Sequence, residues 1–335
     1  MSEFIIMFRK VLMFVALAIP GFVLVKSKAL KQEQSGALSK ILCTVAMFFF
    51  IMTSTINNVS FAVEDLPILG VSAIIGVGYT LLLFFLSKPL TAMEGKSLMD
   101  GELTEEVKLW NSKKRGMLRF ASIFSNNGFL GIPLAYEVLG KNSPAIAVLI
   151  VINIITNLAM LTLGDHIVSG GKSKLKIGVI LTNPVLLGFL IGMVINLTKV
   201  HLIVPEITSF TTHFGNLVTP ISMTILGMKM AGVDLAKVFT NWKTYYSASI
   251  KLILTPTLII AILFGLKYAF GLHIIDKWVI LGTFIAFSVP TAGLASALAD
   301  KHDGDIENSV VYTLGSTVLS IITIPLLYML LNLLI

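Results

Sequence analysis

The sequence is poor in the charged residues that soluble proteins expose. Charged side chains make up 13% of its 335 residues, whereas hydrophobic side chains make up 56%, and the mean hydropathy is +0.90. Apolar runs recur from Phe4 to the C-terminus, each about 20 residues long, which is enough to cross a bilayer as a helix. This composition excludes a soluble domain and predicts an all-α protein that crosses a membrane several times.

Cysteine and the common catalytic motifs are almost absent. Cys43 is the single cysteine, which excludes an intrachain disulfide and a cysteine-based metal site. The sequence contains no HExxH, no GxSxG, no nucleotide-binding loop and no pair of intramembrane aspartates; Gly164-Asp165 is too short a match to indicate a protease. We therefore expect no enzyme, no metal and no cofactor. The net charge of +7 informs on membrane orientation rather than on nucleic-acid binding.

The apolar runs predict ten membrane spans. They cover residues 4–25, 37–57, 66–86, 117–139, 144–167, 178–198, 204–230, 243–268, 277–299 and 307–334. The first span is expected to remain in the mature chain, because Arg9 and Lys10 interrupt it and no small-residue cleavage site follows it.

Positive charge predicts how these spans are oriented. Of the 25 Lys and Arg residues, eighteen flank the loops that follow the odd-numbered spans and six flank the other side. This bias places both termini outside the cell membrane and the loop 87–116 in the cytoplasm. In that loop, Thr104 followed by two glutamates predicts a capped short helix, which either lies on the inner leaflet by its Val107 and Trp110 edge or is a solvated connector.

Span 4 contains a stretch that breaks helices, Asn126-Asn127-Gly128-Phe129-Leu130-Gly131-Ile132-Pro133. Pro133 lacks an N–H and clashes with the carbonyl four residues earlier, and the two glycines lower the cost of irregular backbone. Non-helical backbone at membrane depth persists only where protein buries it or where it lines a cavity. The break and its two amides therefore predict a binding site, with a packing kink as the alternative.

Span 9 contains a matching break at Ser288-Val289-Pro290-Thr291. Ten spans divide into two sets of five, and because five is odd the second set enters the membrane from the opposite side. We therefore expect two inverted repeats, residues 1–168 and 169–335. Two matching breaks in an inverted repeat are a typical sign of a transporter site.

The breaks predict the chemistry of this site. Pro133 and Pro290 are suited to the first position of a new half-helix, and two half-helix N-termini that face each other favour a small anion such as a carboxylate. Asn126, Asn127 and the hydroxyls of Ser288 and Thr291 would orient it as neutral donors. A cation held by freed carbonyls is the alternative, ranked lower because no acidic residue lies near either break.

Three further features are accessory candidates, each with a structural alternative. Asn153 and Asn157 share one face of span 5, where they either form an interhelical hydrogen bond or contribute to the site. Thr219-Pro220 either kinks span 7 for packing or walls the cavity. Lys251 is the single charge well inside a span; it either acts in the interior or extends to the membrane surface.

The motif Asn126 to Leu134 resembles the signature of the auxin efflux carrier family, which includes plant PIN carriers and bacterial malate and malonate permeases. Other segments resemble the family in order and spacing: Asn183-Pro184, Thr219-Pro220-Ile221-Ser222 with Leu226-Gly227, Lys251 with Pro256, and Ser316 to Pro325. The resemblance covers nearly the whole chain. Met47 is a departure, since the family usually has a proline in this part of span 2.

The resemblance implies a fold of two inverted five-helix repeats with crossed, discontinuous helices 4 and 9, similar to bile acid symporters and sodium/proton antiporters. It implies a scaffold and a transport domain, and crossing-point residues at Asn126, Asn127, Gly128, Gly131, Pro133 and Pro290 with its neighbours. The short loop after span 5 favours a prokaryotic member.

Together, these features predict a secondary carrier of small organic anions that works by elevator-type alternating access. The substrate is expected to be a mono- or dicarboxylate such as malate, or an auxin-like weak acid, and no ATP-binding motif is present. A sodium-coupled symporter, a ligand-gated channel and a receptor are the alternatives. The sequence leaves open the substrate, the direction of transport and the oligomeric state, for which a homodimer is one arrangement.

Overall fold

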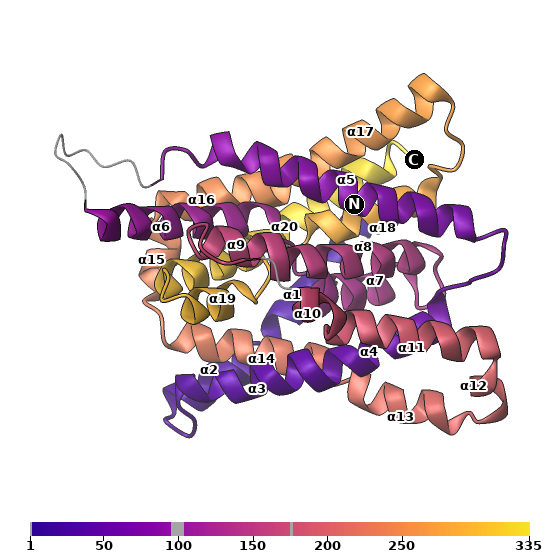
Figure 1. The fold of residues 1–335 in the computed structure, drawn as a ribbon, viewed down its shortest axis with the longest axis horizontal. Helices are drawn as coiled ribbons and strands as arrows, with labels where there is room; N and C mark the ends of the chain where they lie inside the picture. The colour runs from indigo at the N-terminus through magenta and orange to yellow at the C-terminus, as the bar shows by residue number, and fades with distance from the viewer. Residues whose placement is uncertain (1, 95–103, 175–176) are drawn as a thin grey trace.

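The computed structural model describes residues 2–94, 104–174 and 177–335, and in these ranges the regular structure is helical except for one β-bridge. The α-helices are α1 (Ser2–Ala16), α2 (Ile19–Lys26), α3 (Ser35–Ile41), α4 (Met47–Asn58), α5 (Leu66–Leu90), α6 (Glu105–Ile123), α7 (Ile132–Leu139), α8 (Ala145–Ala159), α9 (Asp165–Val168), α10 (Ile177–Leu181), α11 (Pro184–Thr198), α12 (Val200–Ile203), α13 (Glu206–Gly215), α14 (Val218–Ala231), α15 (Leu235–Thr240), α16 (Trp242–Ser249), α17 (Thr255–Phe270), α18 (Lys277–Ser288), α19 (Ala295–Lys301) and α20 (Ile306–Asn332). Figure 1 shows their arrangement.

Six helical segments are long and apolar enough to cross a membrane. They are Phe4–Lys26, Gln32–Asn58, Leu66–Leu90, Ala145–Val168, Trp242–Phe270 and Ile306–Asn332. Each coincides with one of the expected spans, and the shorter apolar helices Pro184–Thr198 and Lys277–Ser288 lie in expected spans 6 and 9. The prediction of an all-α, multi-pass membrane protein is confirmed.

Spans 1, 6 and 7 are each divided into two helices. Span 1 consists of α1 and α2, span 6 contains α10 and α11, and span 7 contains α13 and α14. In each case a proline (Pro20, Pro184 or Pro220) lies in the first turn of the second helix. A proline there costs little, because the first backbone N–H groups of a helix have no intrahelical partner.

The capped helix expected in the loop 87–116 is present but does not end before span 4. Thr104 accepts a hydrogen bond from the Val107 N–H at 3.4 Å, and α6 then continues to Ile123 without a break. The loop helix and the first half of span 4 are therefore one helix, which corrects the expectation of a separate short helix. Residues 95–103 of this loop, and residues 175–176 of the basic segment after span 5, lie outside the described residues.

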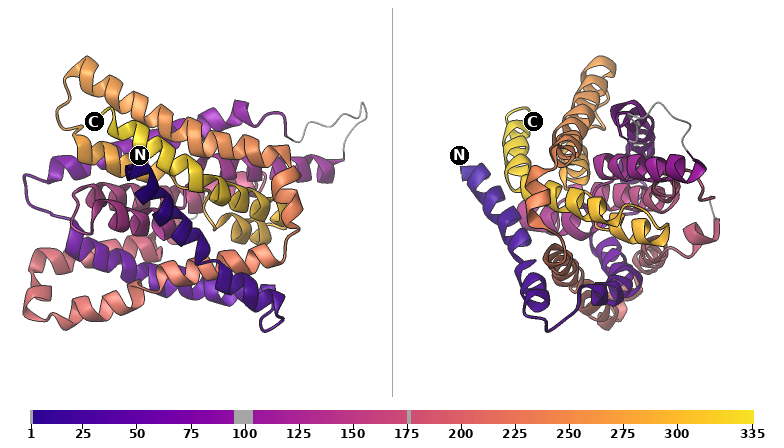
Figure 2. Two further views of the ribbon diagram at one scale, coloured as in Figure 1. Left: turned by 180° about the vertical axis from the view of Figure 1, so that it is seen from behind. Right: turned by 90° about the vertical axis from the view of Figure 1, so that its left-hand side faces the viewer.

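The helices form two groups, visible in Figures 1 and 2. The panel consists of α2, α3, α4, α11, α13 and α14; the crossing group consists of α5 to α9 and α16 to α20. Helix α1 connects the groups, because it packs against α20 while α2 packs against α14.

Glycines bring the panel helices close together. A Cβ added at Gly188 would lie 2.4 Å from the Phe48 carbonyl oxygen, and one at Gly227 would lie 1.8 Å from the Ala18 carbonyl oxygen. Small residues allow such close approach between helices in membranes, where packing rather than the hydrophobic effect drives association. The panel is therefore a tightly packed unit.

The interior of the crossing group is formed mainly by α8 and α18. Residues 145–154 of α8 and 279–288 of α18 are all buried, and the two helices approach closely at Gly282, where an added Cβ would lie 2.6 Å from the Ala145 carbonyl oxygen. A helix that is apolar on all faces is expected to be enclosed by others or by lipid. Since α18 ends at Ser288, the second break lies in the interior of the protein.

Candidate functional site

The two breaks cross and hydrogen-bond to each other. Ser125 and Thr291 form an antiparallel β-bridge. The Asn126 N–H donates to the Pro290 carbonyl at 2.8 Å, and the Ala292 N–H donates to the Phe124 carbonyl at 3.0 Å. Buried backbone groups need partners, and here each break supplies them to the other. This pairing stabilises irregular backbone at a depth where water cannot.

Side chains complete the hydrogen bonding at the ends of α6 and α18. The Thr291 hydroxyl donates to the Ala121 carbonyl at 2.7 Å, while the Thr291 N–H donates to the Ser316 hydroxyl at 3.1 Å. The Lys251 ammonium donates to the Phe287 carbonyl at 2.8 Å. These contacts place donors at helix C-termini, where carbonyls lack intrahelical partners.

Lys251 is 0% exposed, so the alternative in which it extends to the membrane surface is wrong. It lies in a π-helical turn, Ile250–Leu254, and its ammonium is held at the C-terminus of α18. A cation is favoured at this end of a helix, because the macrodipole is negative there. The reading of Lys251 as a charge that acts in the interior agrees with this placement.

The second half-helices begin elsewhere than predicted. After the first break, a π-helical turn starts at Asn127 and runs into α7, so the helix begins there rather than at Pro133. The Ile132 N–H donates to the carbonyl of Asn127, five residues earlier. With the same spacing, the Gly128 carbonyl would accept from the N–H of residue 133. Pro133 has no N–H, which leaves the Gly128 carbonyl without that partner.

After the second break, α19 begins at Ala295 rather than at Pro290. Pro290 lies in the extended crossing segment, and its carbonyl accepts the Asn126 N–H. The prediction that Pro290 starts a half-helix is wrong, because pairing across the crossing holds residues 289–292 extended. Proline is tolerated in this segment since it lacks only a donor, and the bridge uses its acceptor.

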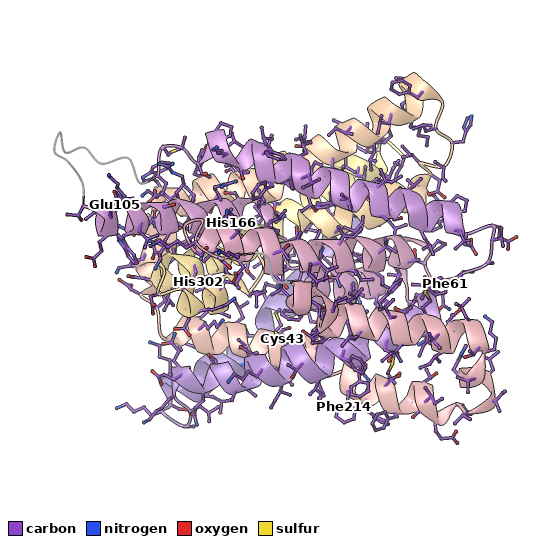
Figure 3. All side chains as sticks on the ribbon, viewed as in Figure 1. Cys43, Phe61, Glu105, His166, Phe214 and His302 are labelled. Atoms are coloured by element: carbon purple, nitrogen blue, oxygen red, sulfur yellow. The ribbon has the colours of Figure 1, made fainter. Side chains whose placement is uncertain are left out.

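A cavity of about 160 Å³ lies beside the crossing, between the panel and the crossing group. The panel contributes the π-helical turn Leu42–Ala46 and the start of α11, and the crossing group contributes both breaks and α8. Figure 3 shows Cys43 of this wall near the middle of the molecule. The lining residues are Cys43, Thr44, Met47, Ser125, Asn126, Asn127, Gly128, Phe129, Asn153, Asn157, Met160, Leu161, Asn183, Pro184, Val185, Ala292, Gly293 and Leu294.

Five of the lining residues are asparagines, and three of them are engaged within the protein. The Asn127 amide donates to the Thr156 hydroxyl at 2.7 Å. The Asn183 amide donates to the Asn157 carbonyl oxygen at 3.1 Å, and its own oxygen caps α11 by accepting from the Val185 and Leu186 N–H groups. The bond between Asn183 and Asn157 joins the panel to the crossing group at the cavity, and all of these bonds fix the orientation of the amides.

The other two asparagines keep hydrogen-bonding capacity for a ligand. Asn153 is 1% exposed, and neither its amide nitrogen nor its oxygen has a partner among the described residues. Asn126 is half-buried. Gly128 leaves the space that Asn153 occupies, because a Cβ at this position would lie 2.9 Å from the Asn153 oxygen. A buried amide without partners is costly, which makes Asn153 a strong candidate for ligand contact.

The structure brings together part of the predicted site. Asn126, Asn127, Gly128, Asn153 and Asn157 line the cavity. The predicted residues that do not line it are Gly131, Pro133, Ser288, Pro290, Thr291, Thr219, Pro220 and Lys251.

The second break reaches the cavity through Ala292, Gly293 and Leu294 instead. Thr291 is turned away because its hydroxyl bonds to α6. Thr219 and Pro220 lie in the first turn of α14, which agrees with the packing interpretation. Sequence reasoning missed Asn183 as a lining residue, since an asparagine directly before a proline is typical of a helix cap.

No Asp, Glu, Lys or Arg lines the cavity among the described residues. The polar groups are amides, hydroxyls and backbone, so the site can donate hydrogen bonds to an anion without a carboxylate that repels it. The helix that starts at Asn127 adds the partial positive charge of its N-terminus. This arrangement can bind a small solute that carries carboxylate oxygens.

Comparison with known proteins links this chain to transport. No protein-family model matches the chain. The chain is 23% identical over 326 residues to a protein of Methanothermobacter thermautotrophicus that is named an uncharacterized transporter. The match spans 94% of this chain and 95% of the other. The fold and this distant, nearly full-length likeness together support a multi-pass membrane protein related to a transporter.

Proposed function

We propose that the protein is a secondary carrier of small organic anions, either a mono- or dicarboxylate such as malate or an auxin-like weak acid. The observation that carries this proposal is the cavity beside the crossing, in which five asparagines meet and Asn153 keeps both amide atoms unpaired among the described residues. Amide and backbone N–H groups orient a carboxylate without a permanent counter-charge. The substrate-contact role is assigned first to Asn153, Asn126 and the backbone at Gly128.

The proposed architecture has ten spans in two inverted repeats, residues 1–168 and 169–335, with discontinuous spans 4 and 9, as in the auxin efflux carrier family. The antiparallel pairing of the two breaks supports this arrangement. Glu105, His166 and His302 lie toward one end of the molecule and Phe61 toward the other (Figure 3), which agrees with alternating sides for successive loops. The proposed orientation in the cell membrane places the end with Glu105 in the cytoplasm and both termini outside.

The proposed mechanism is elevator-type alternating access, in which the crossing group moves against the panel. The cavity lies at the boundary between these groups, so relative motion would change its access. Away from the cavity, α7 contacts the panel and α1: the Tyr136 hydroxyl bonds to the Ser54 hydroxyl at 2.7 Å, and Lys10 pairs with Glu137. These contacts would break when the opposite side opens.

Flux measurements in proteoliposomes test the proposal. A carrier of carboxylates should show uptake that saturates with substrate concentration and counterflow when the vesicles are preloaded with unlabelled substrate. Flux that rises linearly without counterflow would indicate a channel, and binding without flux would indicate a receptor. A thermal-shift screen against a carboxylate panel selects the substrate first, because a ligand that binds the folded state raises the apparent stability.

Replacing sodium by a large organic cation tests the coupling. No acidic residue lines the cavity among the described residues, so flux should change by less than a factor of about two when sodium is replaced. Loss of a sodium site that contributes about 1.4 kcal/mol to binding would change it about tenfold. Strict sodium dependence would establish the sodium-coupled symporter and overturn a carrier without a cation site.

A further inference from the structure

A lysine that does not line the cavity lies beside its panel wall. Lys229 is near the end of α14, and its ammonium donates to the hydroxyl of Ser296 in α19. Ser296 follows the lining residue Leu294 by two positions. Helix α14 also contacts both π-helical turns that line the cavity, Leu42–Ala46 and Asn127–Gly131. Lys229 therefore links the panel to the crossing group at the edge of the candidate site.

Helix α14 packs against the π-helical turn Leu42–Ala46, which carries Cys43, and Lys229 interacts electrostatically with this cysteine. Cys43 lines the cavity. Among the described residues Lys229 forms no direct ion pair. Asp300 interacts with it electrostatically without forming an ion pair. Its side chain is partly buried. Even partial burial of a charge without a paired counter-charge has a desolvation cost.

Among the described residues no charged side chain lines the cavity, and the positive charge of Lys229 interacts with Cys43 of its panel wall. The amides of Asn126 and Asn153 recognise oxygens whether a solute is charged or neutral, since they donate to both. Charge discrimination needs a further group. A lysine suits this role, because its ammonium is a compact point charge on a flexible stem that can exchange one acceptor for another.

Building on the carrier function proposed above, we propose that Lys229 determines the specificity for anions. A carboxylate in the cavity takes the Lys229 ammonium from the Ser296 hydroxyl, whereas a neutral solute of the same shape leaves it in place. Lys229 thereby supplies the counter-charge that the five lining asparagines lack, and it couples occupancy of the cavity to the contact between the panel and α19.

The first test uses the single cysteine and needs no substrate. In detergent, purified protein is treated with three methanethiosulfonate reagents of similar size and charge −1, 0 or +1, and the rates at Cys43 are measured by mass spectrometry. The rates for the charged reagents are divided by that for the neutral reagent, which removes effects of thiol ionisation. A positive charge near the thiol favours the anionic reagent over the cationic one.

Lys229→Gln should lower this anion-to-cation ratio about tenfold, Lys229→Arg should keep it, and Lys174→Gln should leave it unchanged. The tenfold figure corresponds to a weak charge interaction at the effective dielectric of a protein. Lys174 is an exposed lysine in the basic segment after span 5 and controls for net charge. An equal ratio in the wild type and in Lys229→Gln would overturn the proposal.

The second test measures ligand selectivity. Lys229→Gln should lower the affinity for a carboxylate found in the thermal-shift screen about tenfold to a hundredfold, and should leave the affinity for its neutral amide analogue unchanged. Ser296→Ala should keep or raise the carboxylate affinity, because it frees the ammonium. If Lys229→Gln does not fold, Ser296→Ala decides the question, because a fall in its carboxylate affinity below that of the wild type would overturn the proposal.

The two proposals fail in different ways. If the wild type binds no carboxylate but its Cys43 labelling ratio depends on Lys229, the carrier function is wrong while the field of Lys229 at the cavity stands. If the wild type binds and transports carboxylates and Lys229→Gln discriminates anionic from neutral ligands as well as the wild type, Lys229 is not the specificity residue. Equal losses for the anion and its amide would indicate a structural role and would also overturn the inference.

Discussion

Asn153→Leu separates binding from folding more sharply than any other substitution in the cavity. Both amide atoms of Asn153 are buried and lack partners among the described residues. Leucine is close to asparagine in size and has no polar atom to satisfy. The substitution therefore removes no hydrogen bond within the described chain from the protein without ligand. It removes only the hydrogen bonds that the Asn153 amide would form with a bound ligand.

The magnitudes follow from the hydrogen bonds involved. A hydrogen bond to a charged ligand contributes about 1.5 to 3 kcal/mol, so the dissociation constant for a carboxylate should rise by roughly ten- to a hundredfold. Removal of a buried polar group without partners is close to neutral for folding or stabilises by up to about 1 kcal/mol. The melting temperature should therefore stay equal to that of the wild type or rise.

Asn183→Leu is the matched control. This amide also lines the cavity, but its oxygen caps α11 at 2.8 Å from the Val185 nitrogen and its nitrogen bonds to Asn157. Loss of a helix cap costs about 1 kcal/mol and loss of the interhelical bond about 0.6 kcal/mol, so this variant should melt below the wild type. Thermal melting and ligand titration of both purified variants provide the test. If Asn153→Leu melts as low as Asn183→Leu and binds like the wild type, the amide is structural and the site assignment is refuted.

Three further substitutions test the packing and charge of the fold. Lys251→Met removes the donor to the Phe287 carbonyl; flux in proteoliposomes should fall at least about tenfold, the effect of 1.4 kcal/mol, and normal flux would show that this charge has no part in transport. Gly227→Ala should destabilise the fold by more than about 3 kcal/mol, because the added methyl group would overlap the Ala18 backbone. Gly36→Ala is the control: its added methyl group meets open space, so the stability should change by less than about 1 kcal/mol. Equal melting temperatures of the two variants would contradict the packing argument. Asp165→Asn weakens contacts to Lys301 at 2.7 Å and His302 at 2.8 Å and should lower the free energy of unfolding by about 2 kcal/mol, measured by thermal melting against Asp234→Asn, an exposed helix cap.

The helix class, the six long apolar helices and the existence of both breaks could be predicted from the sequence. Hydrophobic length is a local property, and so is the effect of Gly131 and Pro133 on a helix. The clustering of Asn126, Asn127 and Asn153 was also accessible, because two neighbouring amides at a break and a third on an apolar helix have few stable alternatives in a membrane.

The start of each half-helix could not be predicted, because it depends on tertiary pairing. Asn126 is held out of the helix by its bond to the Pro290 carbonyl, a residue far away in the sequence. The π-helical turn that follows shifts the hydrogen-bond register so that Pro133 fits inside a continuous segment. Local rules place proline at a helix start, and here a distant carbonyl overrides them.

Lys229 shows the same limit for charge. From the sequence it counts among the positive residues that flank the inner ends of the spans, as do other lysines with no role in a site. The role proposed for it rests on the contact of α14 with α19 and on its electrostatic interaction with Cys43, which are relations between spans 2, 7 and 9. Hydrophobic periodicity carries no information about such contacts.

In the proposed carrier, the hydrogen bonds at the crossing determine which part of the protein can move. The two breaks exchange backbone bonds at 2.8 and 3.0 Å, and Thr291 adds a bond to α6. Separation of the breaks would expose several backbone groups in a place without water, each at a cost of several kcal/mol. The contacts at the boundary are cheaper to exchange, because the Tyr136, Glu137 and Lys229 side chains there are long and can find water or ligand as new partners. A change of access should therefore take place between the panel and the crossing group, with the crossing itself intact.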